Sequence, residues 1–237
     1  MRRTVTIPRR YFDDLYGRTA DPWAFETSPY EAEKYRTTLQ ALGSDCGRLL
    51  EIGCSIGVLT QELAERCRSL LAIDVSDRAL AIARQRCRGQ RHVAFRRLMA
   101  PRELPMETFD TVLVSEVAYY WDWKDLQRFI QWLLAALNPD GRCALVHWTG
   151  ETDYPLTADQ VHDFVTRSTQ PFLSVSDSLR TPEYRLDVLS RSRASPMKDG
   201  RGGARAEPVR RDVSHPVIEP GECRPVAKQA APRDKRG

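Results

Sequence analysis

The most constraining feature of this chain is an apolar run that ends in a glycine turn and is followed by a second apolar run ending in an acid. The first run is Leu49–Ile52, the turn holds Gly53 and Gly57, and Asp74 follows Gly53 by 21 residues. This pattern predicts a strand, a tight turn, a helix and a second strand that ends in a carboxylate. An α/β sheet uses such a unit to hold the ribose of a nucleoside at the carboxyl ends of its strands.

The spacing of the turn argues against a dinucleotide. A pyrophosphate-binding turn reads Gly-x-Gly-x-x-Gly, and its middle glycine lets the backbone approach the phosphates. Here Ser55 occupies that middle position, and Glu51 lies just before the turn. A carboxylate at this point repels phosphate and attracts a cationic group. The expected ligand is therefore S-adenosylmethionine, which has a sulfonium and an ammonium group but no phosphate; a purely structural turn is the alternative.

The string Glu51-x-Gly53-x-x-x-Gly57 resembles motif I of the class I methyltransferases, and Asp74 matches their acidic residue after the second strand. This resemblance implies a Rossmann-like class I methyltransferase fold. Independently, strands alternating with helices predict a doubly wound, mostly parallel seven-stranded sheet. Strands are expected near residues 48–52, 70–73, 93–98, 111–115, 143–148, 172–176 and 184–189. Helices are expected at 28–42, 58–66, 77–87, 126–137 and 157–166, with a partly helical stretch at 11–25 and a turn at 138–141.

Composition separates a body from a tail. Residues 191–237 contain no Leu, Phe, Tyr or Trp, and they hold twelve Lys/Arg against six Asp/Glu, a net charge of +6 in a chain of +4. Residues 1–190 therefore carry about −2, which does not favour nucleic-acid binding. The tail lacks the apolar surface that would offset its ordering entropy, so we expect 191–237 to be disordered. The remaining units are an N-terminal segment, 1–43, and a catalytic domain, 44–190.

Ligand-binding residues are expected where the parallel strands end, because ligands of open α/β sheets lie there. Asp74 is expected to accept hydrogen bonds from both ribose hydroxyls. Many methyltransferases have an acid for the adenine amine after the third strand, whereas this chain has Leu98-Met99-Ala100. We expect backbone groups and the thioether of Met99 to hold the adenine. The cofactor-binding residues predicted from strand ends are Glu51, Gly53, Cys54, Gly57, Asp74, Val75, Met99, Ala100 and Ser115.

The block Ser115-Glu-Val-Ala-Tyr-Tyr-Trp121 places a carboxylate and aromatic rings where the transferred methyl group should point. Aromatic faces stabilise a sulfonium and exclude water. We predict Glu116 and Tyr119 as catalytic residues, with core packing as the alternative role of the neighbouring tryptophans. His147, at the end of a later strand, is a third candidate, either as a proton acceptor or as a structural histidine.

Residues 11–189 resemble the nodulation protein S group of class I methyltransferases. The resemblance rests on Asp21-Pro-Trp23, on Ser28-Pro-Tyr-Glu31 with Lys34-Tyr35, on Glu51-x-Gly53-Cys54, and on Ser115-Glu-Val-x-Tyr-Tyr120. It implies N-methylation of the free amine of a deacetylated chitooligosaccharide, on the way to a lipochitooligosaccharide nodulation signal. It also implies that the N-terminal helical segment closes over the cofactor as a lid, with Trp23 and Tyr35 among the cofactor-binding residues.

Other classes of protein receive no support from the sequence. The six cysteines and four histidines show no metal-ligand spacing, and no signal peptide or apolar run of membrane-spanning length is present. We therefore expect a cytoplasmic enzyme that binds neither metal nor membrane, with a small-molecule or oligosaccharide amine as its partner and no indicated oligomeric state. A class I methyltransferase acting on another O-, C- or N-nucleophile, and a silent cofactor-binding module, are the alternatives.

Overall fold

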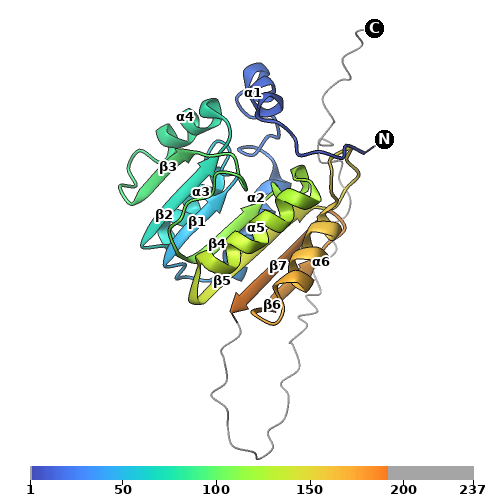
Figure 1. Cartoon of the computed structure of the whole chain (residues 1–237). Coiled ribbons are helices and arrows are strands. Elements are labelled where there is room, and N and C mark those ends of the chain that lie inside the picture. Colours follow the sequence, from blue (N-terminus) through green and yellow to red (C-terminus); the bar gives the residue numbers. More distant parts are fainter. Residues whose placement is uncertain (1, 192–237) are drawn as a thin grey trace, which may run out of the picture.

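The computed structural model of the protein describes residues 2–191, and these form a seven-stranded sheet in the order β3-β2-β1-β4-β5-β7-β6 (Figure 1). Strands β1 to β5 are parallel, and β7 and β6 complete the sheet as antiparallel strands. The predicted doubly wound, mostly parallel sheet is confirmed. The strands are β1 (Arg48–Ile52), β2 (Ser69–Asp74), β3 (Val93–Arg97), β4 (Phe109–Ser115), β5 (Leu137–Trp148), β6 (Leu173–Arg180) and β7 (Tyr184–Arg191).

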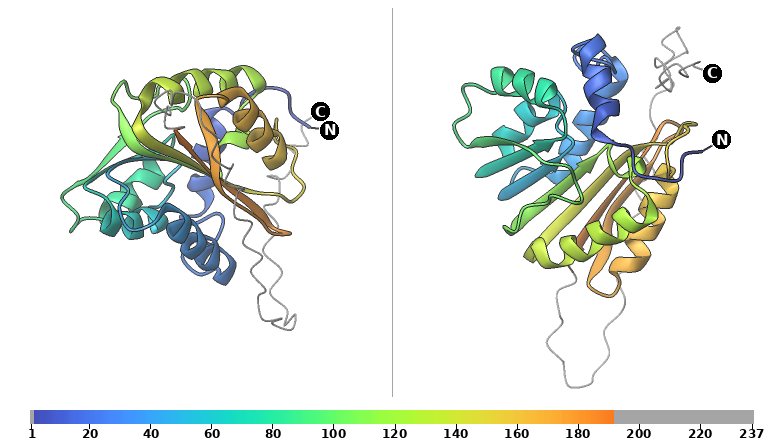
Figure 2. Two further views of the ribbon diagram at one scale, coloured as in Figure 1. Left: turned by 90° about the horizontal axis from the view of Figure 1, so that it is seen from below. Right: turned by 45° about the horizontal axis from the view of Figure 1, so that its top comes forward.

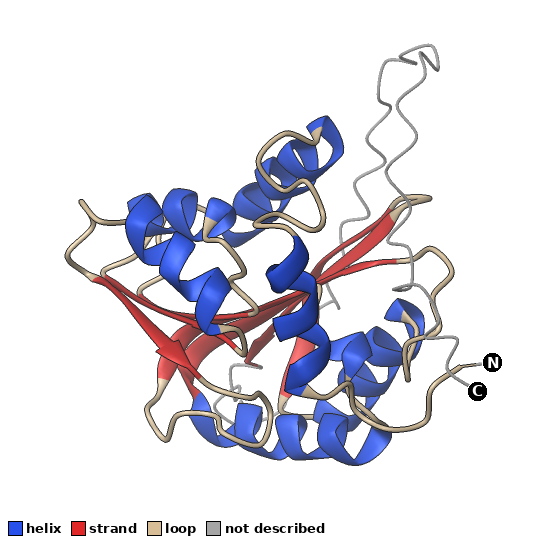
Figure 3. Cartoon of the chain, turned by 90° about the horizontal axis from the view of Figure 1, so that it is seen from above, coloured by secondary structure: helices blue, strands red, loops and turns tan. Residues whose placement is uncertain are grey.

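Helices cover both faces of the sheet (Figures 2 and 3). Side chains alternate along each strand, so Leu50 and Ile52 pack with α5 and α6 while Leu49 packs on the opposite face with α2, α3 and α4. The result is a three-layer arrangement with an apolar core on each side of the sheet. The helices are α1 (Arg9–Arg18), α2 (Pro29–Leu42), α3 (Val58–Leu63), α4 (Asp77–Arg86), α5 (Trp123–Ala136) and α6 (Ala158–Thr169), with the 3₁₀ turns η1 (Ala64–Arg66) and η2 (Ala118–Tyr120).

Local capping explains where the helices begin. The Ser28 side chain accepts a hydrogen bond from the Glu31 amide at the start of α2, and Thr157 forms a complete capping box with Gln160 at the start of α6. Asp122 caps α5 in the same way. These caps satisfy backbone amides that have no partner within the helix. The predicted starts of two helices at Ser28 and Thr157 are confirmed.

The predicted turn at 138–141 lies inside the bounds of β5, at a point where the pairing of that strand is interrupted. Helix α5 ends at Ala136, and Phe109 at the start of β4 pairs with Leu137 before the register shifts. The Asn138 side chain donates a hydrogen bond of 2.7 Å to Asp110 on β4. The next pair joins Thr111 to Arg142, so residues 138–141 form an irregularity of β5, and a Cβ atom on Gly141 would lie 2.9 Å from the Asn138 carbonyl oxygen. The Asn-Pro-Asp-Gly segment thus keeps the close approach of a turn within the strand.

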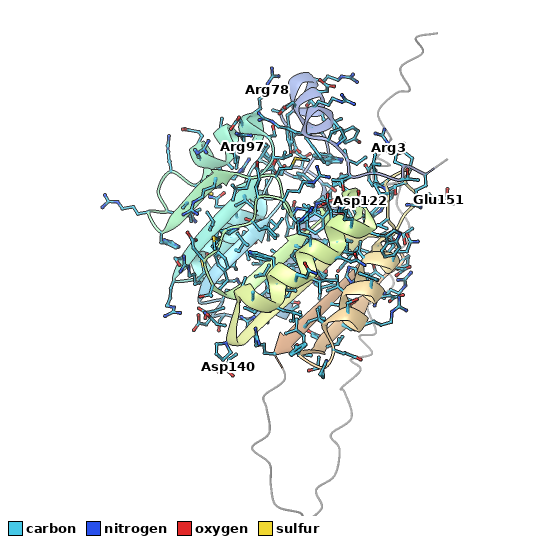
Figure 4. The ribbon with its side chains drawn as sticks, in the orientation of Figure 1. Arg3, Arg78, Arg97, Asp122, Asp140 and Glu151 are labelled. Atoms are coloured by element: carbon cyan, nitrogen blue, oxygen red, sulfur yellow. The ribbon has the colours of Figure 1, made fainter. Side chains whose placement is uncertain are left out.

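Helix α1 and the segment before it lie over the end of the sheet where the parallel strands finish (Figures 1 and 2). The Ile7 amide donates to the carbonyl of Tyr120, and the Thr6 hydroxyl donates to Asp125 on α5 at 2.7 Å. Figure 4 shows Arg3 of this segment on the same side of the molecule as Asp122 at the start of α5. These bonds fix the N-terminal segment above the carboxyl ends of the strands.

Of the predicted tail, only Arg191 is described, as the last residue of β7; the disorder predicted for the rest concerns residues outside the described part. Within residues 2–191, no helix is both long and apolar enough to cross a bilayer.

Candidate active site

Two adjoining cavities lie at the carboxyl ends of β1, β2 and β4. The larger holds about 750 Å³ of space between atoms, part of it open to solvent, and the smaller about 330 Å³. Together they form a concave site at one edge of the sheet, where ligands of open α/β sheets lie. Their walls have five residues in common: Phe25, Gly53, Ser55, Ser115 and Glu116.

The linings separate the predicted residues into two groups. The larger cavity contains Trp23, Asp74, Val75, Met99 and Ala100, whereas the smaller one contains Tyr35, Glu51 and Cys54. Ten of the predicted cofactor-binding residues therefore line one cavity or both. Gly57 lines neither of them.

The charge of these walls indicates the kind of ligand. Glu51, Asp74 and Glu116 contribute three carboxyl groups, and no arginine or lysine of the described residues lines either cavity. A pyrophosphate would meet no compensating cation here, whereas a cationic ligand would meet favourable charges. The walls therefore fit a nucleoside with positive groups, as the turn spacing predicted.

The glycine turn is shaped by two close approaches of the backbone. Gly53 has φ of +87°, and a Cβ atom there would lie 2.0 Å from the Val117 side chain. Gly57 has φ of +79°, and its Cβ would lie 2.9 Å from the Cβ and 3.0 Å from the Cα of Ala83 on α4. The first glycine leaves the cavity floor open, and the second lets α3 begin against α4.

Asp74 holds the turn to the second strand. One of its carboxylate oxygens accepts from the Ser55 amide at 3.0 Å and the other from the Ser76 amide at 2.9 Å. Burial raises the pKa of Asp74 above its ordinary value, although the Ser76 and Ser55 amides oppose this effect. Each oxygen has lone-pair capacity beyond its backbone bond, so the carboxylate can still accept from ligand hydroxyls.

Glu51 is a buried carboxyl at the floor of the smaller cavity. It is 2% exposed, and it accepts a hydrogen bond of 2.6 Å from the hydroxyl of Thr60. Burial raises the pKa of Glu51 to about 7, because the hydroxyl bond compensates only part of the lost hydration. A cation bound beside it would favour the ionised form.

This shift predicts a pH dependence of stability. The folded chain keeps the Glu51 proton up to about pH 7, whereas an unfolded glutamate releases it near its ordinary pKa of 4.5. The contribution of the protonated Glu51 side chain to the stability of the fold is complete below about pH 4.5. This contribution is lost as the pH rises through 7. Between pH 5 and 8, the free energy of unfolding should fall by about 2–3 kcal/mol more in wild type than in Glu51→Gln, at about 1.4 kcal/mol per pKa unit.

Urea unfolding of both proteins across this pH range checks the prediction. Glu62→Gln on the exposed side of α3 is the matched control and should follow the wild-type curve. Parallel curves for wild type and Glu51→Gln would show that Glu51 does not titrate in this window.

Glu116 stands on the wall common to both cavities. Its φ is +59°, an uncommon conformation for a residue with a side chain, and its backbone amide donates to Val146 on β5. One carboxylate oxygen accepts from the Lys34 ammonium at 2.7 Å, and the other from the Tyr119 hydroxyl and the Trp148 amide. Ser55, opposite in the glycine turn, also has positive φ. Such backbone strain concentrates at functional sites.

Tyr119 contacts the site through Glu116 and does not itself line a cavity. Its ring is 1% exposed and stacks against Tyr154 with the centroids 5.3 Å apart. Burial raises the pKa of the Tyr119 hydroxyl well above its ordinary value, so this hydroxyl is a hydrogen-bond donor to Glu116.

His147 lies in the core and not at the cavities. Its Nε2 accepts from the Ala118 amide at 3.1 Å, so its Nδ1 carries the proton and donates to His162 Nε2 at 3.0 Å. His162 Nδ1 then donates to Asp187 at 2.7 Å. Both rings are fully buried, and burial lowers the pKa of His162. With both ring nitrogens of His147 in use, its predicted proton-accepting role has no support in this geometry.

Five further residues of the N-terminal segment line the larger cavity, although no sequence motif marked them as site residues: Thr6, Ile7, Phe12, Tyr16 and Phe25. The Tyr16 hydroxyl hydrogen-bonds the Ser55 hydroxyl at 2.5 Å, which joins α1 to the glycine turn. For Phe12, Tyr16 and Phe25, the density of aromatic residues between positions 11 and 25 was the available signal; Thr6 and Ile7 lie outside it.

The family model of Nodulation protein S matches residues 13–147, which is more than half of the chain. The chain belongs to the Nodulation protein S family. Nodulation protein S of Bradyrhizobium diazoefficiens is 32% identical over 123 residues, covering 51% of this chain and 59% of that protein. The protein of the same name from Sinorhizobium fredii is 32% identical over 124 residues, covering 51% and 57%. The chain thus spans less than two thirds of the length of these relatives.

Solved structures agree with this family and fold. The N-methyltransferase NodS from Bradyrhizobium japonicum WM9, in complex with S-adenosyl-L-homocysteine, is 25% identical with a TM-score of 0.68, covering 76% of this chain and 97% of that one. A putative methyltransferase from Pseudomonas syringae is 36% identical with a TM-score of 0.58, covering 68% and 99%. The predicted Nodulation protein S family and class I methyltransferase fold are confirmed, and the prediction of a methyltransferase is confirmed at the level of the family.

Proposed function

We propose that this member of the Nodulation protein S family is an S-adenosylmethionine-dependent methyltransferase that methylates the free amine of a deacetylated chitooligosaccharide. The proposed use of S-adenosylmethionine rests on the pair of adjoining cavities at the strand ends. Their walls hold three carboxyl groups and no arginine or lysine of the described residues. The solved relative with S-adenosyl-L-homocysteine supports the same cofactor.

The residues divide into two binding regions. Asp74 would accept the ribose hydroxyls in the larger cavity, where Val75, Met99 and Ala100 would contact the adenine. Glu51 and Cys54 would face the amino-acid end in the smaller cavity, beside Tyr35. S-adenosylmethionine supplies an electrophilic methyl group on a sulfonium. Trp23 and Phe25 would cover the ligand from the N-terminal segment and keep water out.

Glu116 is proposed to orient the acceptor, because it stands where the two cavities join. Its carboxylate can accept an N–H of the amine and stabilise the positive charge that develops on nitrogen. Tyr119 holds one oxygen of this carboxylate in place. His147 would take no part in the transfer, because it serves the core. An amine needs only a neutral lone pair and correct alignment, so positioning would supply most of the rate.

The acceptor is tested by incubating the full chain with labelled S-adenosylmethionine and either a deacetylated or a fully acetylated chitooligosaccharide. We expect label on the deacetylated sugar alone, because the lone pair of an amide nitrogen is delocalised and a poor nucleophile. The rate should rise with pH through the titration of the sugar amine. Label on neither sugar, together with transfer to a phenol or a carbon nucleophile, would remove this acceptor and leave the methyltransferase assignment standing.

A further inference from the structure

A buried lysine lies directly behind the cavity wall that carries Glu116. Lys34 projects from α2, is 0% exposed, and contacts two carboxylates, Glu31 at 2.8 Å and Glu116 at 2.7 Å. It also lies over the ring of Tyr30, 4.9 Å from its centroid. Of these partners, Glu116 alone lines a cavity.

Stability does not account for this cluster. Removing two carboxylates and an ammonium from water is costly, and apolar replacements of buried ion pairs are often as stable or more so. Burial by itself would lower the pKa of Lys34, yet the charges of Glu116 and Glu31 outweigh burial and raise it. Lys34 therefore stays charged between the two carboxyl groups that it contacts.

We propose that Lys34 is a positioning residue of the active site, which holds Glu116 as an ionised, correctly oriented carboxylate. Its ion pair also connects that carboxylate to helix α2 of the N-terminal segment. This inference rests on the methyl transfer proposed above. Without the ammonium, Glu31 and Glu116 would be two neighbouring buried carboxylates, and one of them would take up a proton. A protonated Glu116 would lose the negative charge with which it meets the acceptor.

Neutral groups cannot replace the lysine. The titratable side chains that face Glu116 are Tyr30, Glu31, Lys34, Tyr35, Tyr119 and Tyr120. The four tyrosines have pKa values raised by burial and by nearby carboxylates, so they remain neutral donors. Glu51, on the wall of the same smaller cavity, adds negative charge when it ionises.

The test compares Lys34→Met with Arg36→Met, a matched control two residues further along α2. Arg36 forms an exposed pair with Glu33 at the same helical spacing as the buried pair of Lys34 with Glu31. With ¹³C-labelled glutamate, and Glu116→Gln to assign the signal, the titration midpoint of the Glu116 carboxyl should rise by at least about one pH unit in Lys34→Met, a tenfold change in protonation. It should not move in Arg36→Met.

Turnover gives a second readout. In Lys34→Met, kcat should fall more at pH 6 than at pH 9, in proportion to the fraction of Glu116 that is protonated at each pH, and adding Glu31→Gln should recover most of this difference. A merely structural role would lower kcat by one factor at every pH.

If Lys34→Met fails to fold, Lys34→Gln keeps two N–H donors without the charge and should show the same shift. An unchanged Glu116 midpoint in a folded variant overturns the inference, even if wild type proves to transfer no methyl group to an amine.

Discussion

Gly57→Ala is expected to destabilise the protein by about 2–5 kcal/mol. An alanine at its φ of +79° costs about 1–2 kcal/mol, and crowding a packed interior costs about 1–3 kcal/mol more. The new Cβ would meet both the Cβ and the Cα of Ala83, so α4 would have to move as a unit. Because the same turn positions Ser55 at the cavities, cofactor binding should weaken together with stability.

Two other glycines separate the causes of this effect. Gly43 has φ of +75° and ψ of −165°, a conformation that is nearly restricted to glycine, and a Cβ atom placed there would meet nothing within 4 Å. Gly43→Ala should therefore cost only the backbone strain of about 1–3 kcal/mol. Gly89 has open space and no positive φ, so Gly89→Ala should change stability by less than about 0.5 kcal/mol. Urea unfolding measures all three variants. If Gly57→Ala were as stable as Gly89→Ala, the described packing of the turn against α4 would be wrong.

Asp74→Asn should weaken binding of S-adenosylhomocysteine by about 1.5–3 kcal/mol, or about 10- to 150-fold. The asparagine has one acceptor oxygen in place of two, while the Ser55 and Ser76 amides both need a partner. The fold should survive, because Asp74 lies at the end of β2 and faces a cavity.

Asp77→Asn is the matched control for this change. Asp77 begins α4 three residues later, is exposed, and pairs with Arg9 and Arg97. It lines neither cavity, so its replacement should leave the dissociation constant unchanged within about twofold, as expected for a surface substitution. Equal losses in both variants would mean that Asp74 acts through general electrostatics and does not contact the ligand.

The sequence predicts the sheet and the cofactor end of the site because both depend on local patterns. Leu49–Ile52 and the residues that end in Asp74 are apolar runs of strand length, and the glycines between them fix the turn. Parallel strands place their carboxyl ends at one edge of the sheet, so Gly53, Asp74 and Ser115 converge without further information.

Contacts between distant segments could not be predicted in this way. No local pattern predicts the burial of Lys34, which depends on Glu116, 82 positions away. Thr6 reaches the site region through Asp125, 119 positions away. The sequence correctly predicts His147 at the end of a strand. Its side chain, however, points to the face of the sheet covered by α6, where it forms a hydrogen bond with His162. Strand ends predict an edge of the sheet, whereas the period of two decides which face a side chain occupies.

Calorimetric titration of the full chain with S-adenosylhomocysteine, and separately with NAD⁺, tests the central claim most directly. The acidic walls of the two cavities predict saturable binding of S-adenosylhomocysteine at one site per chain. They predict no measurable binding of NAD⁺, whose pyrophosphate would meet carboxylates without a compensating cation. Absence of S-adenosylhomocysteine binding to the folded chain, or equally tight binding of NAD⁺, would contradict the account.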